Sequence, residues 1–362
     1  MSTTPQPLPF FGRAWQVAVN TADGKTYSVQ STVADGEDPL RVTFKIENYA
    51  LLAYWQAEVA IYNMEASIRN QVRGIQNLND FWAFNQPLVA GDSLSLSAGY
   101  RAANSTQPFD VGANLLYAGK ILQSAWTREN VTDYRLTLRC VTGLLEDALN
   151  FVSFSLSKGA TAYDAVTQAA GHANIPVEHI DQAATDALKS SAFARGQAFH
   201  SRPFSTFRDL TKQNNLLAWV SPNGLNVRSF DPKTTPAAPN FAYAPVNLDT
   251  SQQQNRQTAI KETLIGTPEQ TQDGVVFRVL LDSSVKIGDI VQLAAGTIVN
   301  LFPVQIGSLP PVPSRDGLYV VAGLKHVGDS RGRGDDWYTE VQGVTMDFFA
   351  NFLQARNPLG KN

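Results

Sequence analysis

An internal repeat constrains this chain of 362 residues more than any other feature of its sequence. Residues 91–99 read GDSLSLSAG and residues 288–296 read GDIVQLAAG, so five of nine positions match without a gap. Each copy combines a Gly-Asp turn, alternating apolar and polar residues, and a later glycine that permits a bulge, which predicts an antiparallel β module. The repeated residues are Gly91, Asp92, Leu96, Ala98 and Gly99 in the first copy and Gly288, Asp289, Leu293, Ala295 and Gly296 in the second.

The segments that follow the two copies also resemble each other. LLYAGKILQSAW at 115–126 resembles LYVVAGLKHVG at 318–328, and this alignment places Gly119 beside Gly323. Each segment then reaches a polar turn and a further strand, YRLTLRCVTG in the first copy and WYTEVQGVTM in the second. The repeat therefore predicts two related antiparallel β modules within one chain.

The chain between the two copies has a different pattern. Residues 157–230 combine helix signals with strands, which predicts a small α+β domain. A capping box at Thr161 opens one helix, and Ser205 is expected to cap a second. The strands LLAWV and LNVRSF flank Asn223-Gly224, a strong hairpin signal.

These patterns predict a mainly β protein with an α+β insertion. The stretch after the insertion is rich in Pro, Asn, Gln and Thr and has no periodicity, which is typical of an extended connector. The predicted parts are the first β module at 1–156, the small α+β domain at 157–230, the connector at 231–256, the second β module at 257–350 and a polar tail at 351–362.

The composition indicates a protein that works in an assembly. Charged residues make up only 17% of the chain, which is low for a protein whose whole surface faces water, so we expect partners to cover part of it. The net charge is −3 and Lys and Arg are scattered, which does not favour binding to nucleic acid. The single cysteine, Cys140, fits a reducing cytoplasm, and the lack of a long apolar run predicts a soluble, unexported chain without membrane insertion.

The sequence contains none of the common catalytic or metal-binding motifs: no P-loop, HExxH, GxSxG or CxxC occurs. Paired carboxylates at 37–38 and 335–336 lie in Gly-rich turns and are interpreted as solvated turn residues. No catalytic, cofactor-binding or metal site is predicted. The histidines are dispersed, so we expect packing or surface roles rather than metal ligation for His172, His179, His200 and His326.

With these features in place, the sequence resembles the baseplate hub proteins of long-tailed phages, including the related hub portion of contractile injection machines. The resemblance is carried by the strand-then-helix phrase AEVAIYNMEASIRNQV, a Gly-Asp strand ending in AGY, and the phrases LLYAGKI and LTLRCVTG. The hairpin LLAWVSPNGLNV and the later phrase IGTPEQTQDGVVFRVLLDSSVKIGDIVQL extend it over about residues 10–350.

The resemblance implies a structural, non-enzymatic hub subunit of the virion tail tip or baseplate, made and assembled in the host cytoplasm. Family members are typically homotrimers in which two β-barrel-like tube modules per chain give six similar modules around a channel. Such a ring would join the tail tube or distal tail proteins on one face to the spike or tip proteins on the other, and DNA would pass without specific binding.

Two other functions stay open at this point. The first is a cell-wall glycan hydrolase of the tail tip, which requires two acids facing one cleft. The second is a receptor-binding adhesin module, because exposed aromatic residues often mark an interface. The aromatic cluster in question is Phe81, Trp82 and Phe84.

Overall fold

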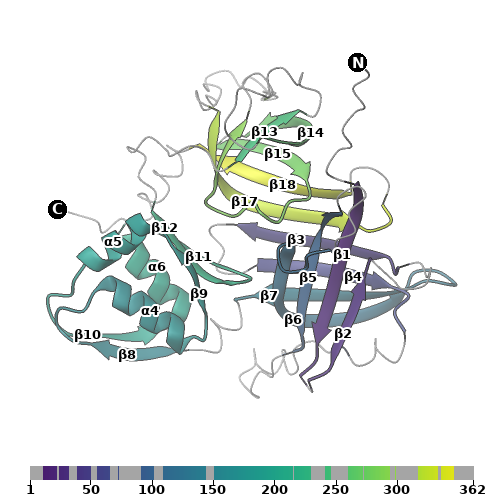
Figure 1. Ribbon diagram of the computed structural model, residues 1–362. Coiled ribbons are helices and arrows are strands. Elements are labelled where there is room, and N and C mark those ends of the chain that lie inside the picture. The colour runs from purple at the N-terminus through teal and green to yellow at the C-terminus, as the bar shows by residue number, and fades with distance from the viewer. Residues whose placement is uncertain are drawn as a thin grey trace, which may run out of the picture.

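One large β-sheet lies beside a small helical region (Figure 1). The computed structural model describes residues 11–22, 24–31, 39–49, 55–65, 72, 91–101, 109–143, 151–214, 216–229, 241–245, 260–271, 273–293, 298, 317–332 and 336–345. The 13 strands of the sheet follow one another in the order β16 (Ile290–Leu293), β13 (Phe241–Pro245), β14 (Ile260–Gln270), β15 (Gly274–Leu280), β18 (Trp337–Val344), β17 (Leu318–Asp329), β3 (Val42–Tyr49), β4 (Trp55–Tyr62), β7 (Tyr134–Thr142), β6 (Leu115–Arg128), β5 (Ser93–Arg101), β1 (Phe11–Asn20) and β2 (Thr26–Gln30).

The strands form where apolar residues recur at every second position. In β3, Val42, Phe44 and Ile46 are buried, whereas Lys45 between them is exposed. This alternation places one face of the strand in the core and the other in solvent. Cys140 of β7 is buried in the same core, as expected for a small apolar side chain, and burial raises the pKa of its thiol to about 12.

The two halves of the sheet have the same strand order. The first half reads β3-β4-β7-β6-β5-β1 and the second reads β14-β15-β18-β17-β16-β13. They meet where β17 pairs with β3, and β16 pairs with β17 as well as with β13. A mainly β fold dominated by antiparallel pairing is confirmed, while the barrel-like form of each half stays a prediction.

The helical region combines three short helices with two small sheets (Figure 1). One sheet is β11-β12-β9 and the other is β10-β8, and the helices α5 and α6 contact β12 and β11. Buried alanines of α4 pack with the other helices in a core of their own. The elements are β8 (Val152–Leu156), α4 (Ala162–His172), β9 (Val177–Ile180), α5 (Gln182–Ser190), β10 (Gln197–Ser201), α6 (Pro203–Gln213), β11 (Leu216–Ser221) and β12 (Gly224–Ser229).

The helix starts agree only in part with the predicted caps. The capping box at Thr161 is confirmed, since Asp164 N donates to Thr161 Oγ1 at 3.3 Å and Thr161 N donates to Asp164 Oδ2 at 2.8 Å. The expected cap at Ser205 is wrong, because α6 begins two residues earlier at Pro203, whose fixed φ suits the first helical position. The sequence analysis also missed α5, which Asp181 caps.

The hairpin expected at Asn223-Gly224 is present, but its loop lies one residue earlier. Ser221 pairs with Gly224, so Pro222 and Asn223 form the loop. Gly224 has a φ of 143°, and a Cβ there would lie 2.2 Å from the backbone oxygen of Pro176. Glycine is therefore required for the close approach of this hairpin to the chain before β9.

The predicted connector contains a strand. Phe241–Pro245 form β13, which pairs with β14 and β16, and Tyr243 is buried among the side chains of the second half. The surrounding prolines hid this short strand from the sequence analysis.

The boundaries between the predicted parts of the chain stay a prediction. The aromatic cluster, the carboxylates 37–38 and Asp335, residues 66–71 of the strand-then-helix phrase AEVAIYNMEASIRNQV, and the tail lie outside the described residues.

Candidate functional site: a row of alternating charges and two junctions

Charged side chains of alternating sign form a row across one face of the large sheet. Arg278 of β15 lies directly opposite Glu340 of β18, and Glu340 lies opposite Lys325 of β17. Lys325 in turn lies opposite Glu47 of β3. Directly opposed residues of antiparallel strands share one face of a sheet, so the charge alternates over four neighbouring strands.

The row continues into the first half of the sheet, one step along β3. Lys45, two residues before Glu47 and therefore on the same face, lies opposite Glu58 of β4. Glu58 lies opposite Arg139 of β7, which lies opposite the uncharged Gln123 of β6. The charged face thus runs from β15 to β7 and crosses the boundary between the halves.

Glu340 neutralises the basic groups on both sides of it. Arg278 Nε lies 2.9 Å from one carboxylate oxygen of Glu340, and Lys325 Nζ lies 3.7 Å from the other. The hydrogen bond with Glu340 raises the pKa of Arg278. The Arg278 side chain is 51% exposed, so the pair faces solvent and contributes little to stability.

The same neutralisation recurs in the first half. Lys45 Nζ lies 2.7 Å from Glu47 Oε1, and this hydrogen bond raises the pKa of Lys45. Glu58 lies between two arginines, 3.4 Å from Arg139 Nε and 3.6 Å from Arg135 Nη2. In the sequence these Lys and Arg residues look scattered, because the row exists only across strands. The local signal is a charged or polar residue at every second position, as in KIE and RLTLR.

The first junction joins the two halves of the sheet. Seven residues of β17 pair with β3, and Arg41 closes the end of this ladder by binding both carboxylate oxygens of Asp329, at 3.1 and 2.6 Å. Arg13 Nη1 donates to the backbone oxygens of Asp329 and Gly332 at 2.5 and 2.8 Å. The bidentate geometry fixes the register between strands that are far apart in the sequence.

Trp337 at the start of β18 anchors the same junction in the core of the first half. Its indole Nε1 donates to the backbone oxygen of Gly99 at 3.2 Å, and its own backbone oxygen accepts from the Tyr100 hydroxyl at 3.1 Å. The Phe44 ring meets it edge to face at 5.3 Å. Trp337 is 3% exposed, so the two halves share buried side chains as well as strands.

A buried histidine lies in the middle of this junction. His326 of β17 lies opposite Ile46 of β3, and its Nδ1 is 2.9 Å from Thr339 Oγ1. It is 2% exposed, and burial lowers its pKa to about 4. The imidazole is therefore neutral near pH 7.

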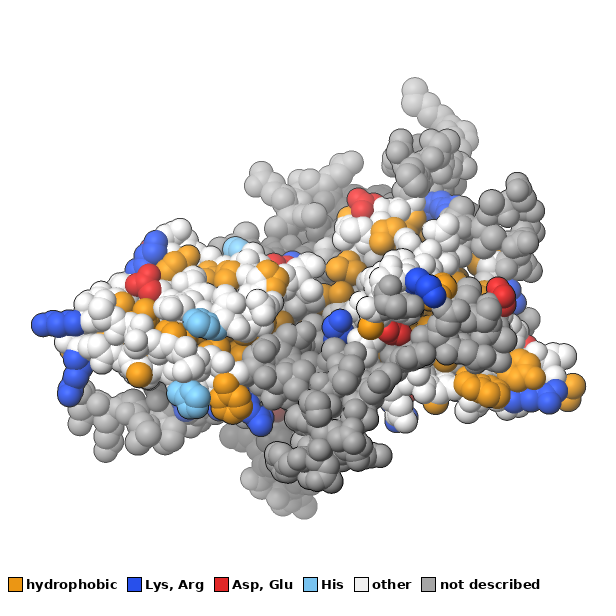
Figure 2. Space-filling model, turned by 90° about the horizontal axis from the view of Figure 1, so that it is seen from below, with side chains coloured by type: hydrophobic (Ala, Val, Ile, Leu, Met, Phe, Trp, Pro, Cys, Tyr) orange, Lys and Arg blue, Asp and Glu red, His pale blue; other side chains and the backbone are white. Residues whose placement is uncertain are grey.

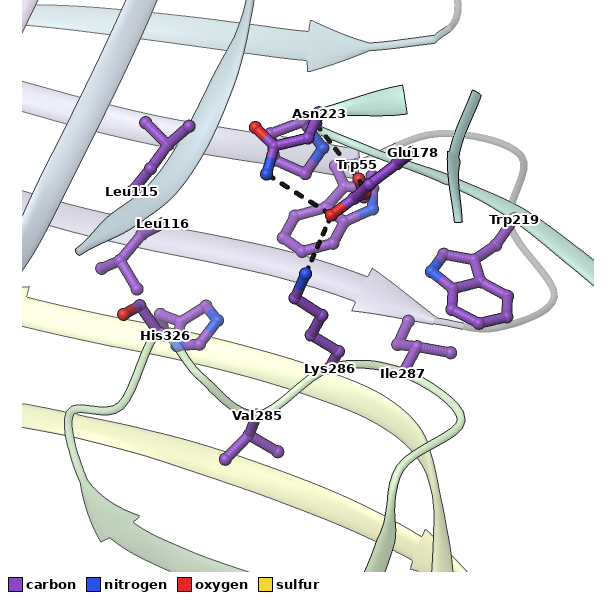
Figure 3. Close-up of a pocket in the computed structure, with 13 residues that line it drawn as sticks. Trp55, Leu115, Leu116, Glu178, Trp219, Asn223, Val285, Lys286, Ile287 and His326 are labelled. Carbon is purple, nitrogen blue, oxygen red and sulfur yellow. Dashed lines mark hydrogen bonds and ion pairs between the residues drawn. The ribbon is translucent and has the colours of Figure 1, made fainter. Parts of the chain in front are cut away.

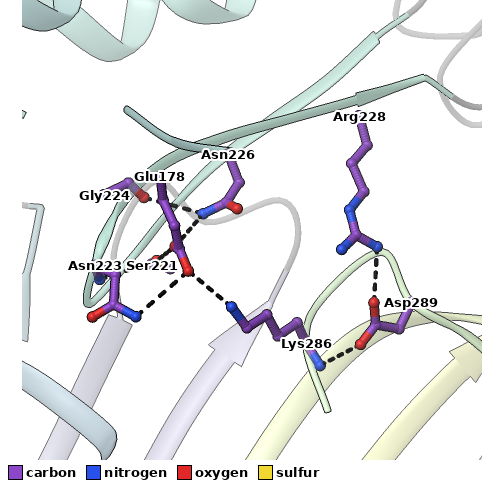
Figure 4. Close-up of polar contacts among 8 residues, drawn as sticks. All are labelled: Glu178, Ser221, Asn223, Gly224, Asn226, Arg228, Lys286 and Asp289. Atoms are coloured by element: carbon purple, nitrogen blue, oxygen red, sulfur yellow. Dashed lines mark hydrogen bonds and ion pairs between the residues drawn. The ribbon is translucent and has the colours of Figure 1, made fainter. Parts of the chain in front are cut away.

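The second junction ties the helical region to the second half of the sheet (Figure 4). Glu178 of β9 binds Lys286 Nζ at 2.8 Å and accepts from Asn226 Nδ2 at 2.7 Å and from the Ser221 hydroxyl. Burial alone would raise the pKa of Glu178. The hydrogen bonds from Lys286, Ser221 and Asn226 and the charge of Lys286 outweigh it and lower the pKa to about 2.

Arg228 of β12 forms the second ion pair of this junction. Its Nη1 lies 2.8 Å from Asp289 Oδ1, and Asp289 Oδ2 accepts from the backbone N of Lys286. Burial raises the pKa of Asp289, and its bonds to Arg228 and Lys286 offset this only in part. A pocket lies beside the Glu178–Lys286 and Arg228–Asp289 ion pairs, and Trp55, Leu116 and His326 also line it (Figure 3).

The first part of the predicted repeat occupies equivalent positions. The backbone oxygen of Asp92 accepts from Ile121 N at 2.8 Å, and that of Asp289 accepts from Val321 N at 2.9 Å. Both aspartates are buried. In the first copy, Gly91 precedes β5, which contains Leu96 and Gly99. In the second copy, Gly288 precedes β16, which ends at Leu293. Gly296 lies outside the described residues.

The second part of the repeat is shifted relative to the predicted alignment. Gly119 of β6 pairs with β5, whereas Gly323 of β17 pairs with β3. Each strand also has a β-bulge: β6 has it at Leu122 in its pairing with β7, and β17 has it at Ala322 in its pairing with β18. Counted from this bulge, Gly119 is equivalent to Tyr319 and not to Gly323.

The described residues carry no candidate metal centre. They contain no group of three or more His, Cys, Asp or Glu side chains that could hold a metal ion. The histidine side chains visible in Figure 2 lie apart from one another. None of the described helices is long and apolar enough to span a membrane.

The comparisons with known proteins point in one direction. The model of the family "Baseplate hub gp41" matches residues 17–238, more than half of the chain. No curated protein sequence matches significantly. Among solved structures, the tail protein from Neisseria meningitidis MC58 is 11% identical, with a TM-score of 0.52, and the match covers 94% of this chain and 98% of that one. At this identity the likeness concerns the fold alone.

Two further solved structures are weaker matches. The 43 kDa tail protein of prophage MuSo2 from Shewanella oneidensis is 10% identical, with a TM-score of 0.46 over 92% of this chain and 98% of that one. The E. coli c3393 protein, a type VI secretion component described as similar to the T4 tail proteins gp27 and gp5, is 8% identical, with a TM-score of 0.43 over 86% and 76%.

Proposed function

The chain belongs to the baseplate hub gp41 family and is a structural protein of the phage tail baseplate, not an enzyme, and from this premise we propose that three copies form a ring that joins the tail tube to the spike or tip. In this ring each chain contributes two similar modules, so that six modules surround a channel. The shared strand order of the two halves of the sheet supports this proposal, because modules of one topology can occupy similar positions around a pseudo-six-fold axis.

Each half of the sheet acts in this proposal as a β-barrel-like tube module. The pairing of the second half supports it, since β13 pairs with both β16 and β14 and so connects the last strand of that half to the first. Closure hides strand edges that would otherwise pair with foreign chains. The predicted parts of the chain, with module boundaries at 1–156 and 257–350, belong to the same proposal, with β13 assigned to the second module.

The row of alternating charges lines the genome channel in this proposal. DNA gains affinity from lysines and arginines that replace its condensed counterions. Here the basic groups already have carboxylate partners, such as Glu340 for Arg278 and Glu58 for Arg139, and the whole chain carries a net charge of −3. A charge-balanced surface of this kind lets the polyanion pass without specific binding, and it is the observation on which the channel role rests.

The hub meets the tail tube or distal tail proteins on one face and the spike or tip proteins on the other, and it assembles in the host cytoplasm before it becomes part of the virion tail. The glycan hydrolase alternative does not survive the family assignment. No observation favours the adhesin alternative, since the aromatic cluster that motivated it lies outside the described residues.

The mass of the purified protein in solution tests the ring. Light scattering or native mass spectrometry should give three times the chain mass of 39.5 kDa. A protein that stays at one chain mass over the whole accessible concentration range contradicts the proposal.

Duplex DNA tests the channel surface. The wild-type protein should leave a labelled duplex unshifted at low salt, whereas E58Q/E340Q removes the carboxylate partners of Arg139, Arg278 and Lys325 and should bind DNA in a salt-dependent way. The matched control D186N/D209N removes two charges from exposed positions of α5 and α6 and should not bind. Equal DNA binding by both double variants would contradict the role of the row.

A further inference from the structure

Two equivalent strand edges differ in whether a neighbour covers them. One edge of β17 pairs with β18 from Val320 to Gly328, and its other edge pairs with β16 as far as Val320 and then with β3 from Gly323 to Asp329. In β6 one edge pairs with β7 from Lys120 to Arg128, and the other edge pairs with β5 as far as Lys120. No described strand pairs with the corresponding edge of β6, which runs over residues 123–128.

The burial of one equivalent position differs between the two strands. The bulges at Leu122 and Ala322 align the two strands, so that Trp126 of β6 is equivalent to His326 of β17. His326, opposite Ile46 of β3, is 2% exposed, whereas Trp126 is 54% exposed. Figure 2 shows hydrophobic and basic side chains together at the end of the molecule where the β6–β7 hairpin lies in Figure 1.

Hydrogen bonds hold the tip of the hairpin that carries this edge. At its tip, Asn130 Oδ1 accepts from the backbone N of Thr132 and of Asp133 at 2.8 and 2.7 Å, and Arg128 donates to the backbone oxygens of Asn130 and Val131. The Asp133 carboxylate accepts from Asn63 of the loop after β4 at 2.9 Å. An ordered strand edge with an exposed tryptophan is a preorganised docking element.

A complementary edge exists in the second half. β14 corresponds to β3 in strand order, and it pairs with β15 on one side. β13 covers its other side only as far as Leu264, so the edge over residues 265–270 has no neighbour among the described strands. In the first half the same side of β3 is the one that receives β17.

We propose that the edge of β6 that no described strand covers pairs antiparallel with the corresponding edge of β14 in a second copy of this chain, an inference that rests on the proposed ring and names its contact. The β17–β3 junction is the template. β17 is equivalent to β6 and β3 is equivalent to β14, so this junction already joins the same two kinds of strand within one chain. Each copy offers both edges, so the contact is head to tail and three copies close it without a free edge.

The register of this contact follows from the template. Direct pairing links one residue on each of four neighbouring strands in the first half: Gln123, Arg139, Glu58 and Lys45. The equivalent residues of the second half, in the same order, are Gly323, Gln342, Val276 and Glu269. Lys45 lies opposite Val327 in the β17–β3 junction. Glu269, its equivalent, therefore lies opposite the equivalent of Val327 in the neighbouring copy, which is Thr127.

A designed disulfide tests this register. Directly opposed residues of antiparallel strands have Cα atoms about 4.5–5.5 Å apart, within the range that a disulfide spans. Thr127 and Glu269 are exposed, and the native Cys140 is buried and does not compete. Oxidised T127C/E269C protein should run as covalent dimers and trimers on a non-reducing gel, whereas T127C, E269C and the control T127C/D186C should not.

The outcomes separate the contact from the ring. Protein of three chain masses that forms no T127C/E269C cross-link overturns the strand pairing and leaves the ring standing, whereas a protein of one chain mass overturns both. A second pair of variants gives an independent readout: W126E should raise the concentration needed for assembly at least tenfold, and V131E, exposed on the same hairpin but outside the paired segment, should not change it. Equal effects of W126E and V131E would also overturn the pairing.

Discussion

Lowering the pH should weaken the junction between the two halves of the sheet through His326. Its pKa is lowered from 6.5 to about 4 in the folded protein by burial, so the unfolded chain takes up a proton more readily. The stability that depends on the neutral ring is therefore complete above pH 6.5 and is lost as the pH falls from 6.5 toward 4. At about 1.4 kcal/mol per pKa unit the full loss is roughly 3 kcal/mol, and about 2 kcal/mol of it should be reached at pH 5.

The assay is the free energy of unfolding from denaturant titrations at pH 7.5 and pH 5. The difference between wild type and H326Q isolates the histidine from every other pH-dependent contribution to stability. The wild type should lose about 2 kcal/mol more than H326Q between the two pH values. H179Q, a substitution in β9 outside this junction, should behave as wild type. An equal loss in wild type and H326Q would refute the reasoning.

Three substitutions test the packing that holds the parts together. W337A removes a buried indole shared by both halves and should lower the free energy of unfolding by about 3–5 kcal/mol in denaturant titrations. R228A leaves Asp289 buried without its cation and should cost about 3 kcal/mol, and adding D289N should restore part of this, whereas no recovery would contradict the pairing. G224A forces a Cβ against the oxygen of Pro176 and should lower the thermal midpoint, whereas G171A, in open space on α4, should raise it slightly.

Local patterns in the sequence predicted the elements that depend on local physics. The period-two alternation of Val42, Phe44 and Ile46 predicts β3, and the box from Thr161 to Asp164 predicts the start of α4. The repeat predicts two related halves, and their strand orders agree. Each of these signals lies within about ten residues of the chain, where hydrogen bonds and burial are set by neighbours.

The junctions and the charged row were out of reach of the sequence because they depend on long-range register. Arg41 and Asp329 are 288 residues apart, and neither has a neighbour in sequence that marks the pair. The bulges at Leu122 and Ala322 shift the repeat without a change in composition, which is why Gly119 was aligned with Gly323. A single-residue slip moves every side chain to the other face of a sheet, so charges can be assigned to one surface only once the pairing is known.

Averaged electron-microscope images of the purified oligomer test the central claim most directly. The account predicts a three-fold ring with six similar lobes around a central opening, with the helical regions as three additional densities. Three widely separated lobes, a two-fold particle or a ring without an opening would contradict the account.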